Sequence, residues 1–113
     1  MNTEKAYNIL ANVLLAHTQE NEKFDKLEMI IEVDEGFLKN EVTRHLGDKE
    51  FYPRLDMISR QANDDLTVAS QFLRSNLLET TGDKIWGFTF TLYPDGQFNI
   101  DYTYDMPEWM QDD

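Results

Sequence analysis

The chain has 113 residues, of which 22 are acidic and ten are basic, so its formal net charge at neutral pH is −12. This length predicts a single domain over residues 1–113, with a core large enough to fold without covalent cross-links. Because cysteine is absent, disulfides, thiolate metal sites and thiol nucleophiles are excluded. An acidic surface repels nucleic acids and membranes and attracts basic partners. We therefore expect a protein partner, and neither nucleic acid nor membrane.

The N-terminal residues predict neither export nor membrane insertion. They lack the basic and then apolar layout of a signal peptide, and no apolar run in the chain reaches the roughly 18 residues of a membrane helix. We therefore expect a soluble protein of the cytoplasm.

An amphipathic helix is predicted over about residues 4–17. Its apolar residues recur at the spacing of one helix face: Ala6, Ile9, Leu10, Val13 and Leu14. Asn2 or Thr3 can cap the first turn, and His17 in the last turn has the sign that the helix dipole favours. We interpret His17 as a helix-end cation or surface residue rather than as a catalytic base.

Residues 26–34 alternate between apolar and polar side chains and predict a half-buried strand. Leu27, Met29, Ile31 and Val33 are expected inward, and Lys26, Glu28 and Glu32 outward. Asp34-Glu35-Gly36 predicts a turn, and residues 37–44 are interpreted as the hairpin partner of the strand. A short helix built on Leu38, Val42 and Leu46 is the alternative. The segment 55–60 fits a helical turn and an extended segment equally well.

A second helix is predicted over about residues 64–79. Its apolar stripe consists of Leu66, Ala69, Phe72, Leu73 and Leu77. Asn63, Asp64 and Asp65 are interpreted as its cap and first turn, because short polar side chains and acids are favoured there. The segment 80–83 is expected to end the helix.

Residues 85–105 predict a β-hairpin with one aromatic face. Every second residue is large and apolar: Trp86, Phe88, Phe90 and Leu92 on the first arm, and Phe98, Ile100, Tyr102 and Tyr104 on the second. Pro94, Asp95 and Gly96 are the residues that a tight reversal requires. If the two arms fold about Asp95, residues whose numbers sum to 190 face each other, for example Leu92 and Phe98. This pairing places all eight apolar side chains on one face, which we interpret as core. Thr89, Thr91, Gln97, Asn99, Asp101 and Thr103 are then expected on a wet face.

These elements predict an α+β fold, in which two helices cover one face of a mainly antiparallel sheet. They predict no catalytic, cofactor-binding or metal-binding residue. The chain has no phosphate-cradling glycine loop and no H-E-x-x-H motif, and His17 and His45 each stand alone. Asp101 and Asp105 lie about 13 Å apart along one strand face, which is too far for one metal ion. We therefore expect a protein that is not an enzyme and carries no cofactor.

The hairpin carries the motif Trp86-x-Phe88-x-Phe90-x-Leu92, followed by Pro94-Asp-Gly96-x-Phe98-x-Ile100-Asp101-Tyr102-x-Tyr104. This motif resembles the C-terminal signature of the YezG-like immunity proteins, which are small antitoxins of bacterial competition systems. The resemblance covers about residues 66–105; Thr103 and the segment 106–113 depart from it. It implies a protein that binds and neutralises a secreted toxin in the producing cell. Similar acidic immunity proteins guard against contact-dependent growth inhibition, and the sequence leaves both settings open.

The charge makes a basic toxin domain, such as a nuclease, the expected partner. Because the aromatic residues are assigned to the core, we expect the contact on acidic surface. The first candidates are Asp95, Asp101, Asp105 and Glu108, and the second are Glu28, Glu32, Asp34 and Glu35. The alternative is a protein-interaction or adaptor domain without a toxin partner, in which weak self-association would cover aromatic residues such as Tyr93 or Trp109.

Overall fold

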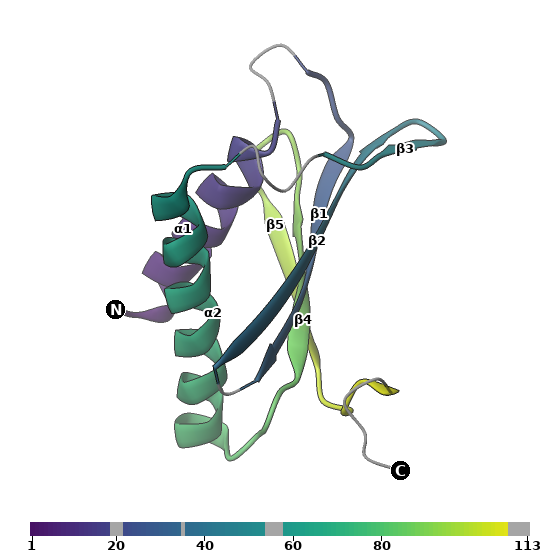
Figure 1. Cartoon of the computed structure of the whole chain (residues 1–113). Coiled ribbons are helices and arrows are strands. Elements are labelled where there is room, and N and C mark those ends of the chain that lie inside the picture. The colour runs from purple at the N-terminus through teal and green to yellow at the C-terminus, as the bar shows by residue number, and fades with distance from the viewer. Residues whose placement is uncertain (19–21, 35, 54–57, 109–113) are drawn as a thin grey trace.

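Five strands form one antiparallel sheet in the computed structural model, which describes residues 1–18, 22–34, 36–53 and 58–108. The elements are α1 (Thr3–Ala16), β1 (Lys26–Asp34), β2 (Phe37–Leu46), β3 (Lys49–Phe51), α2 (Arg60–Thr81), β4 (Gly87–Leu92) and β5 (Phe98–Thr103). The strand order is β3-β2-β1-β4-β5. Both helices lie on the same side of the sheet (Figure 1). The predicted α+β fold is therefore confirmed, and β2 is a strand rather than the alternative helix.

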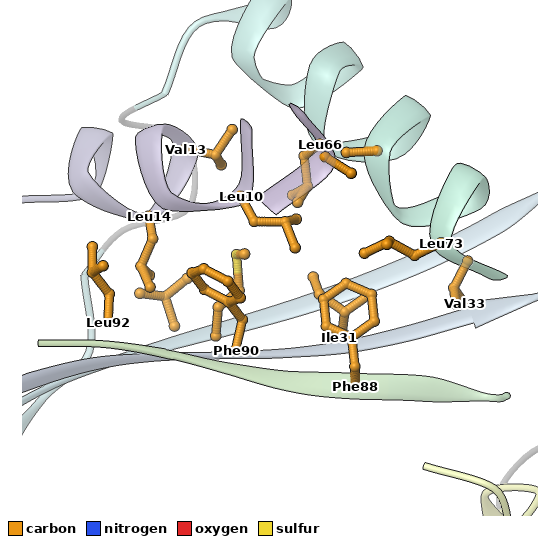
Figure 2. Packing of buried hydrophobic residues seen from close by; sticks show 14 of the residues in the cluster. Leu10, Val13, Leu14, Ile31, Val33, Leu66, Leu73, Phe88, Phe90 and Leu92 are labelled. Carbon is orange, nitrogen blue, oxygen red and sulfur yellow. The ribbon is translucent and has the colours of Figure 1, made fainter. Parts of the chain in front are cut away.

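One hydrophobic core fills the space between the helices and the sheet. Leu10 and Leu14 of α1 and Leu66 and Leu73 of α2 approach the sheet residues Ile31, Val33, Phe88, Phe90 and Leu92 (Figure 2). The inward side chains of β1 and β4 are all buried. Complete burial of one such side chain contributes about 1.5–3 kcal/mol. The core therefore fixes the backbones of β1 and β4, and with them the positions from which the side chains of the other face extend. Within the described residues, neither helix has the length and apolar character that crossing a membrane requires.

The C-terminal hairpin has the register that the sequence predicts. Its cross-strand pairs include Leu92 with Phe98, Phe90 with Ile100 and Phe88 with Tyr102. In the turn, the Asp95 carboxylate accepts a hydrogen bond from the backbone N–H of Gln97 at 3.0 Å. Gly96 has a φ of 88°, a conformation that favours glycine. The proline, aspartate and glycine between the arms therefore form the predicted reversal.

The second arm of the hairpin is less buried than predicted. Strand β5 lies at the edge of the sheet, and the side chains of Phe98 and Tyr104 are 45% and 55% exposed. Tyr7 of α1 reaches this edge, where its hydroxyl lies 3.1 Å from that of Tyr102. Burial, with this hydrogen bond, raises the pKa of Tyr102 far above its ordinary value. The prediction that all eight apolar residues are core is thus wrong for Phe98 and Tyr104, whereas Ile100 and Tyr102 pack against the core and are partly buried. Alternation assigns a face but does not say what covers it.

Helix α2 begins earlier than predicted, at Arg60 rather than near residue 64. Its cap is Ser59, whose hydroxyl accepts a hydrogen bond from the N–H of Ala62 at 3.0 Å. Asp64 and Asp65 therefore lie inside the helix, and their interpretation as cap residues is wrong. The apolar stripe marks only the part of α2 that packs on the sheet, so it conceals the polar first turn. Helix α2 ends as predicted, at Gly82 in the left-handed conformation.

Gly87 marks a close approach between the two central strands. A Cβ added at Gly87 would overlap the carbonyl oxygen of Ile31 and lie 3.1 Å from Cα of Glu32. Both neighbours are backbone atoms of β1, which a side-chain rotation cannot remove. Glycine is therefore required here because a side chain would have no space. Backbone conformation is not the reason, since the φ of Gly87 is not in the left-handed region.

His17 is buried, contrary to its interpretation as a surface cation. Only 1% of its surface is exposed, and Nδ1 lies 3.0 Å from the carbonyl oxygen of Val13. Burial lowers the pKa of His17 below its ordinary value of 6.5, and this outweighs the opposite effect of the hydrogen bond. The folded protein therefore favours the neutral imidazole.

We expect this histidine to make stability depend on pH. The unfolded chain takes up a proton at His17 near pH 6.5, whereas the folded chain resists it, so stability falls as the pH drops below this value. The measurement is Tm between about pH 8 and about pH 5.5, above the range in which ordinary carboxylates titrate. His17→Asn retains a donor for the Val13 carbonyl without the titration, so its Tm should fall less steeply. Parallel curves for the two proteins would contradict the assignment.

Candidate partner-binding face

The sheet face that the helices leave uncovered is the candidate site, which we call the open face. It is formed by alternate side chains of four strands, as the cross-strand register places them. They are Lys26, Glu28, Ile30 and Glu32 of β1, Lys39, Glu41, Thr43 and His45 of β2, Thr89 and Thr91 of β4, and Asn99, Asp101 and Thr103 of β5. Glu50 of β3 extends the face beside His45. In the part of the chain that the structure describes, no helix lies over these residues (Figure 1).

An apolar side chain occupies the centre of the open face. Ile30 is 37% exposed, and its register neighbours are Glu41 on β2 and Thr89 on β4. Asp101 on β5 continues the same row beyond Thr89. At the usual strand spacing of about 4.8 Å, Glu41 and Asp101 stand about 14 Å apart with Ile30 between them. This row suits a partner surface in which an apolar anchor is flanked by basic groups.

The open face carries more negative charge than the helix layer. Five carboxylates point to it against two lysines: Glu28, Glu32, Glu41, Glu50 and Asp101 against Lys26 and Lys39. The two helices together carry four acids against three basic residues: Glu4, Asp64, Asp65 and Glu79 against Lys5, Arg60 and Arg74. A basic molecule is therefore attracted more strongly to the open face.

The structure unites residues from both predicted groups of contacts. Glu28 and Glu32 lie on β1 and Asp101 on β5, and β4 alone separates these strands. Asp105 and Glu108 are exposed and follow the end of β5, while Asp95 lies in the turn at the other end. The two predicted groups, chosen separately from the sequence, therefore lie on neighbouring parts of one sheet.

Asp34 and Glu35, the other two predicted contacts on this part of the chain, are not placed on the open face. Asp34 forms an ion pair with Arg74 of α2 at 3.2 Å, and its backbone carbonyl accepts a hydrogen bond from Gln71 at 2.8 Å. These bonds tie α2 to the end of β1, which gives Asp34 a structural role. Glu35 lies outside the described residues, as does Trp109.

His45 lies between two carboxylates of the open face. Its Nε2 is 3.6 Å from Glu28, and its Nδ1 is 3.8 Å from Glu50. These distances are longer than those of hydrogen bonds. Among the described residues, no group of three or more histidine, aspartate or glutamate side chains has an arrangement that could hold a metal ion. The carboxylates of the open face give it a negative potential, which attracts cationic groups.

Sequence reasoning missed Ile30 and Glu41, which form the centre of the open face. Both could have been placed by extending the predicted hairpin. The register of β1 with β2 pairs Lys26 with His45 and Ile30 with Glu41. Ile30 is also the apolar exception in the otherwise polar series Lys26, Glu28 and Glu32 at the outward positions of β1.

Comparisons with known proteins assign no family to the chain: no protein-family model matches it, and no curated protein is found to match it either. The site is therefore defined by the geometry described above.

Proposed function

We propose that this chain is an immunity protein that binds a basic toxin domain on its open face and neutralises it by occlusion. The observation that carries the proposal is the row of Glu41, Ile30 and Asp101 on an uncovered sheet face. The resemblance of the hairpin motif to YezG-like immunity proteins supports the toxin as the kind of partner. The net charge of −12 supports a basic partner.

The open face can compete with nucleic acid for a basic cleft. A nuclease holds the phosphate backbone with lysine and arginine side chains, and carboxylates on adjacent strands present negative charge to the same side chains. Complementary charge raises association rates to about 10⁸–10⁹ M⁻¹s⁻¹ at low salt. An inhibitor that must act before the toxin reaches its substrate gains from such rapid capture.

Rigidity of the sheet supports tight binding. The carboxylates on β1 and β5 lie in one layer with β4, whose inward side chains are buried in the core. Because the core holds the central strands in place, little backbone freedom remains to be lost in the complex. The exposed apolar side chain of Ile30 supplies a contact at the centre of the face, which is where the strongest contacts of an interface tend to cluster.

Co-expression tests the proposal. The chain is produced together with the toxin domain encoded directly upstream of it, and growth and complex formation are measured. We expect growth to be restored, and a complex whose affinity falls steeply as salt is raised. No complex and no rescue would overturn the proposal. If growth is restored but the affinity of the complex does not depend on salt, the chain is an immunity protein, and the carboxylates of the open face are not what binds the toxin domain.

A further inference from the structure

Strand β5 is an unprotected edge of the sheet. It pairs with β4 on one side, and within the described residues no strand pairs with its other side. Its six residues contain no proline, lysine or arginine. The opposite edge strand, β3, has only three residues, one of which is Lys49. Short strands and lysines are devices that keep natural edges from pairing with other chains, and β5 has neither.

The register fixes which backbone groups of β5 point outward. Tyr93 donates its N–H to the carbonyl of Gln97 at 2.9 Å, so these two residues form a hydrogen-bonded pair. Such pairs alternate along an antiparallel ladder, so Asn99, Asp101 and Thr103 bond to β4. The N–H and C=O groups of the intervening residues then face away from the sheet. These residues are Phe98, Ile100 and Tyr102.

The two sides of this edge differ in chemistry. On the helix side, Phe98 and Tyr104 are about half exposed, and Ile100 and Tyr102 are partly exposed. On the open-face side, Asn99 and Asp101 are exposed, and the amide of Asn99 donates to the Asp101 carboxylate at 3.0 Å. A strand added here would place alternate side chains against aromatic rings and against a carboxylate.

We propose that β5 pairs with an extended, basic segment of the partner protein, which becomes a sixth strand of the sheet. The partner is that of the proposed function, on which this inference rests. The charge around the edge selects a basic segment: no lysine or arginine follows Lys84, whereas Asp95, Asp101, Asp105 and Glu108 do. A second copy of this chain is disfavoured as the occupant, because each copy carries a net charge of −12.

The edge adjoins the open face. Asp101 belongs to β5 and also ends the row that contains Ile30 and Glu41. One partner can therefore place a strand along β5 while its folded part covers the open face. The segment is expected to alternate apolar residues, which pack beside Phe98 and Ile100, with lysine or arginine residues, which lie beside Asp101.

Amide hydrogen exchange tests this pairing without any substitution. The ¹⁵N-labelled chain is compared alone and in complex with the unlabelled toxin domain encoded directly upstream. The amides of Phe98, Ile100 and Tyr102 should exchange at least about tenfold more slowly in the complex. Those of Asn99, Asp101 and Thr103, which already bond to β4, should change less. This alternation distinguishes strand pairing from general shielding.

A matched pair of variants provides the second measurement. Ile100→Ala and Ile100→Pro both remove the partly buried side chain, but only proline also removes the outward N–H. We expect Ile100→Pro to bind about tenfold more weakly than Ile100→Ala, from one lost hydrogen bond and the disturbed strand.

The outcomes separate this inference from the proposed function. Slower exchange at the three outward amides supports strand pairing. A complex that protects cells but leaves these amides unchanged overturns strand pairing and leaves immunity intact. Absence of any complex, with no signal of the labelled chain shifted, overturns both.

Discussion

Glu41→Lys combined with Asp101→Lys is expected to abolish the protection of cells that produce the toxin domain. The two carboxylates flank Ile30 in the central row of the open face, and both are exposed. Reversing them replaces attraction of a basic surface by repulsion along the whole row. Steering by complementary charge contributes roughly 10- to 1,000-fold to association rates, so we expect the rate to fall about 100-fold at low salt.

The control reverses an equal amount of charge on the other layer of the molecule. Asp64→Lys with Glu79→Lys changes two exposed acids of α2, which lie on the helix side of the sheet. Both double variants alter the net charge equally, so a general effect of charge would weaken them alike. Association rates are measured at several salt concentrations, and circular dichroism checks the fold. If the α2 variant loses as much protection as the open-face variant, the open face is not the contact.

Gly87→Ala is expected to be the most damaging single-methyl change for the fold. The added Cβ would overlap the backbone carbonyl of Ile31, so β1 and β4 must separate or the ladder between them must distort. Overpacking of well-packed interiors typically costs 1–3 kcal/mol, and we expect about 3 kcal/mol here because neither neighbour can rotate away. This corresponds to a fall in Tm of roughly 10 °C. Urea or thermal unfolding measures it.

Thr89→Ala is the matched control for this substitution. Thr89 lies on the same strand and the same face, and its truncation to alanine adds no atom near the backbone of β1. Loss of β propensity there costs up to about 1 kcal/mol. A Gly87→Ala protein as stable as Thr89→Ala would contradict the close approach of β1 and β4.

The hairpin and its register were predictable because several local signals agree. The turn residues set the pairing, and the alternation of aromatic side chains selects the same pairing independently. The start of α2 was not predictable in this way. An apolar stripe reports where a helix packs, whereas the first turn of α2, which Ser59 caps, carries only Ala62 as an apolar residue and so extends the stripe too little to be noticed.

The burial of single residues required the whole fold. His17 is a polar residue that comes directly after the apolar stripe of α1. Its polarity favours the surface, yet its side chain is buried. Phe98 is apolar and was expected in the core, yet it is partly exposed. The strand order places β5 at an edge of the sheet that the helices cover only in part. The composition of the candidate site also depends on the whole fold. Glu28 and Asp101 were selected separately from the sequence, and only strand order brings them together, with β4 between them.

The order of the strands also determines when the fold can be completed during synthesis. Strand β1 can pair with β2 as soon as the first hairpin is made, but its other neighbour, β4, lies 65 residues away in the pair Leu27–Leu92. Phe88 and Phe90, among the largest buried side chains, belong to this late strand. Long-range pairing of this kind slows folding. A nascent chain therefore leaves this edge of β1 unpaired until the last quarter of the sequence is available, and unpaired strand edges favour aggregation.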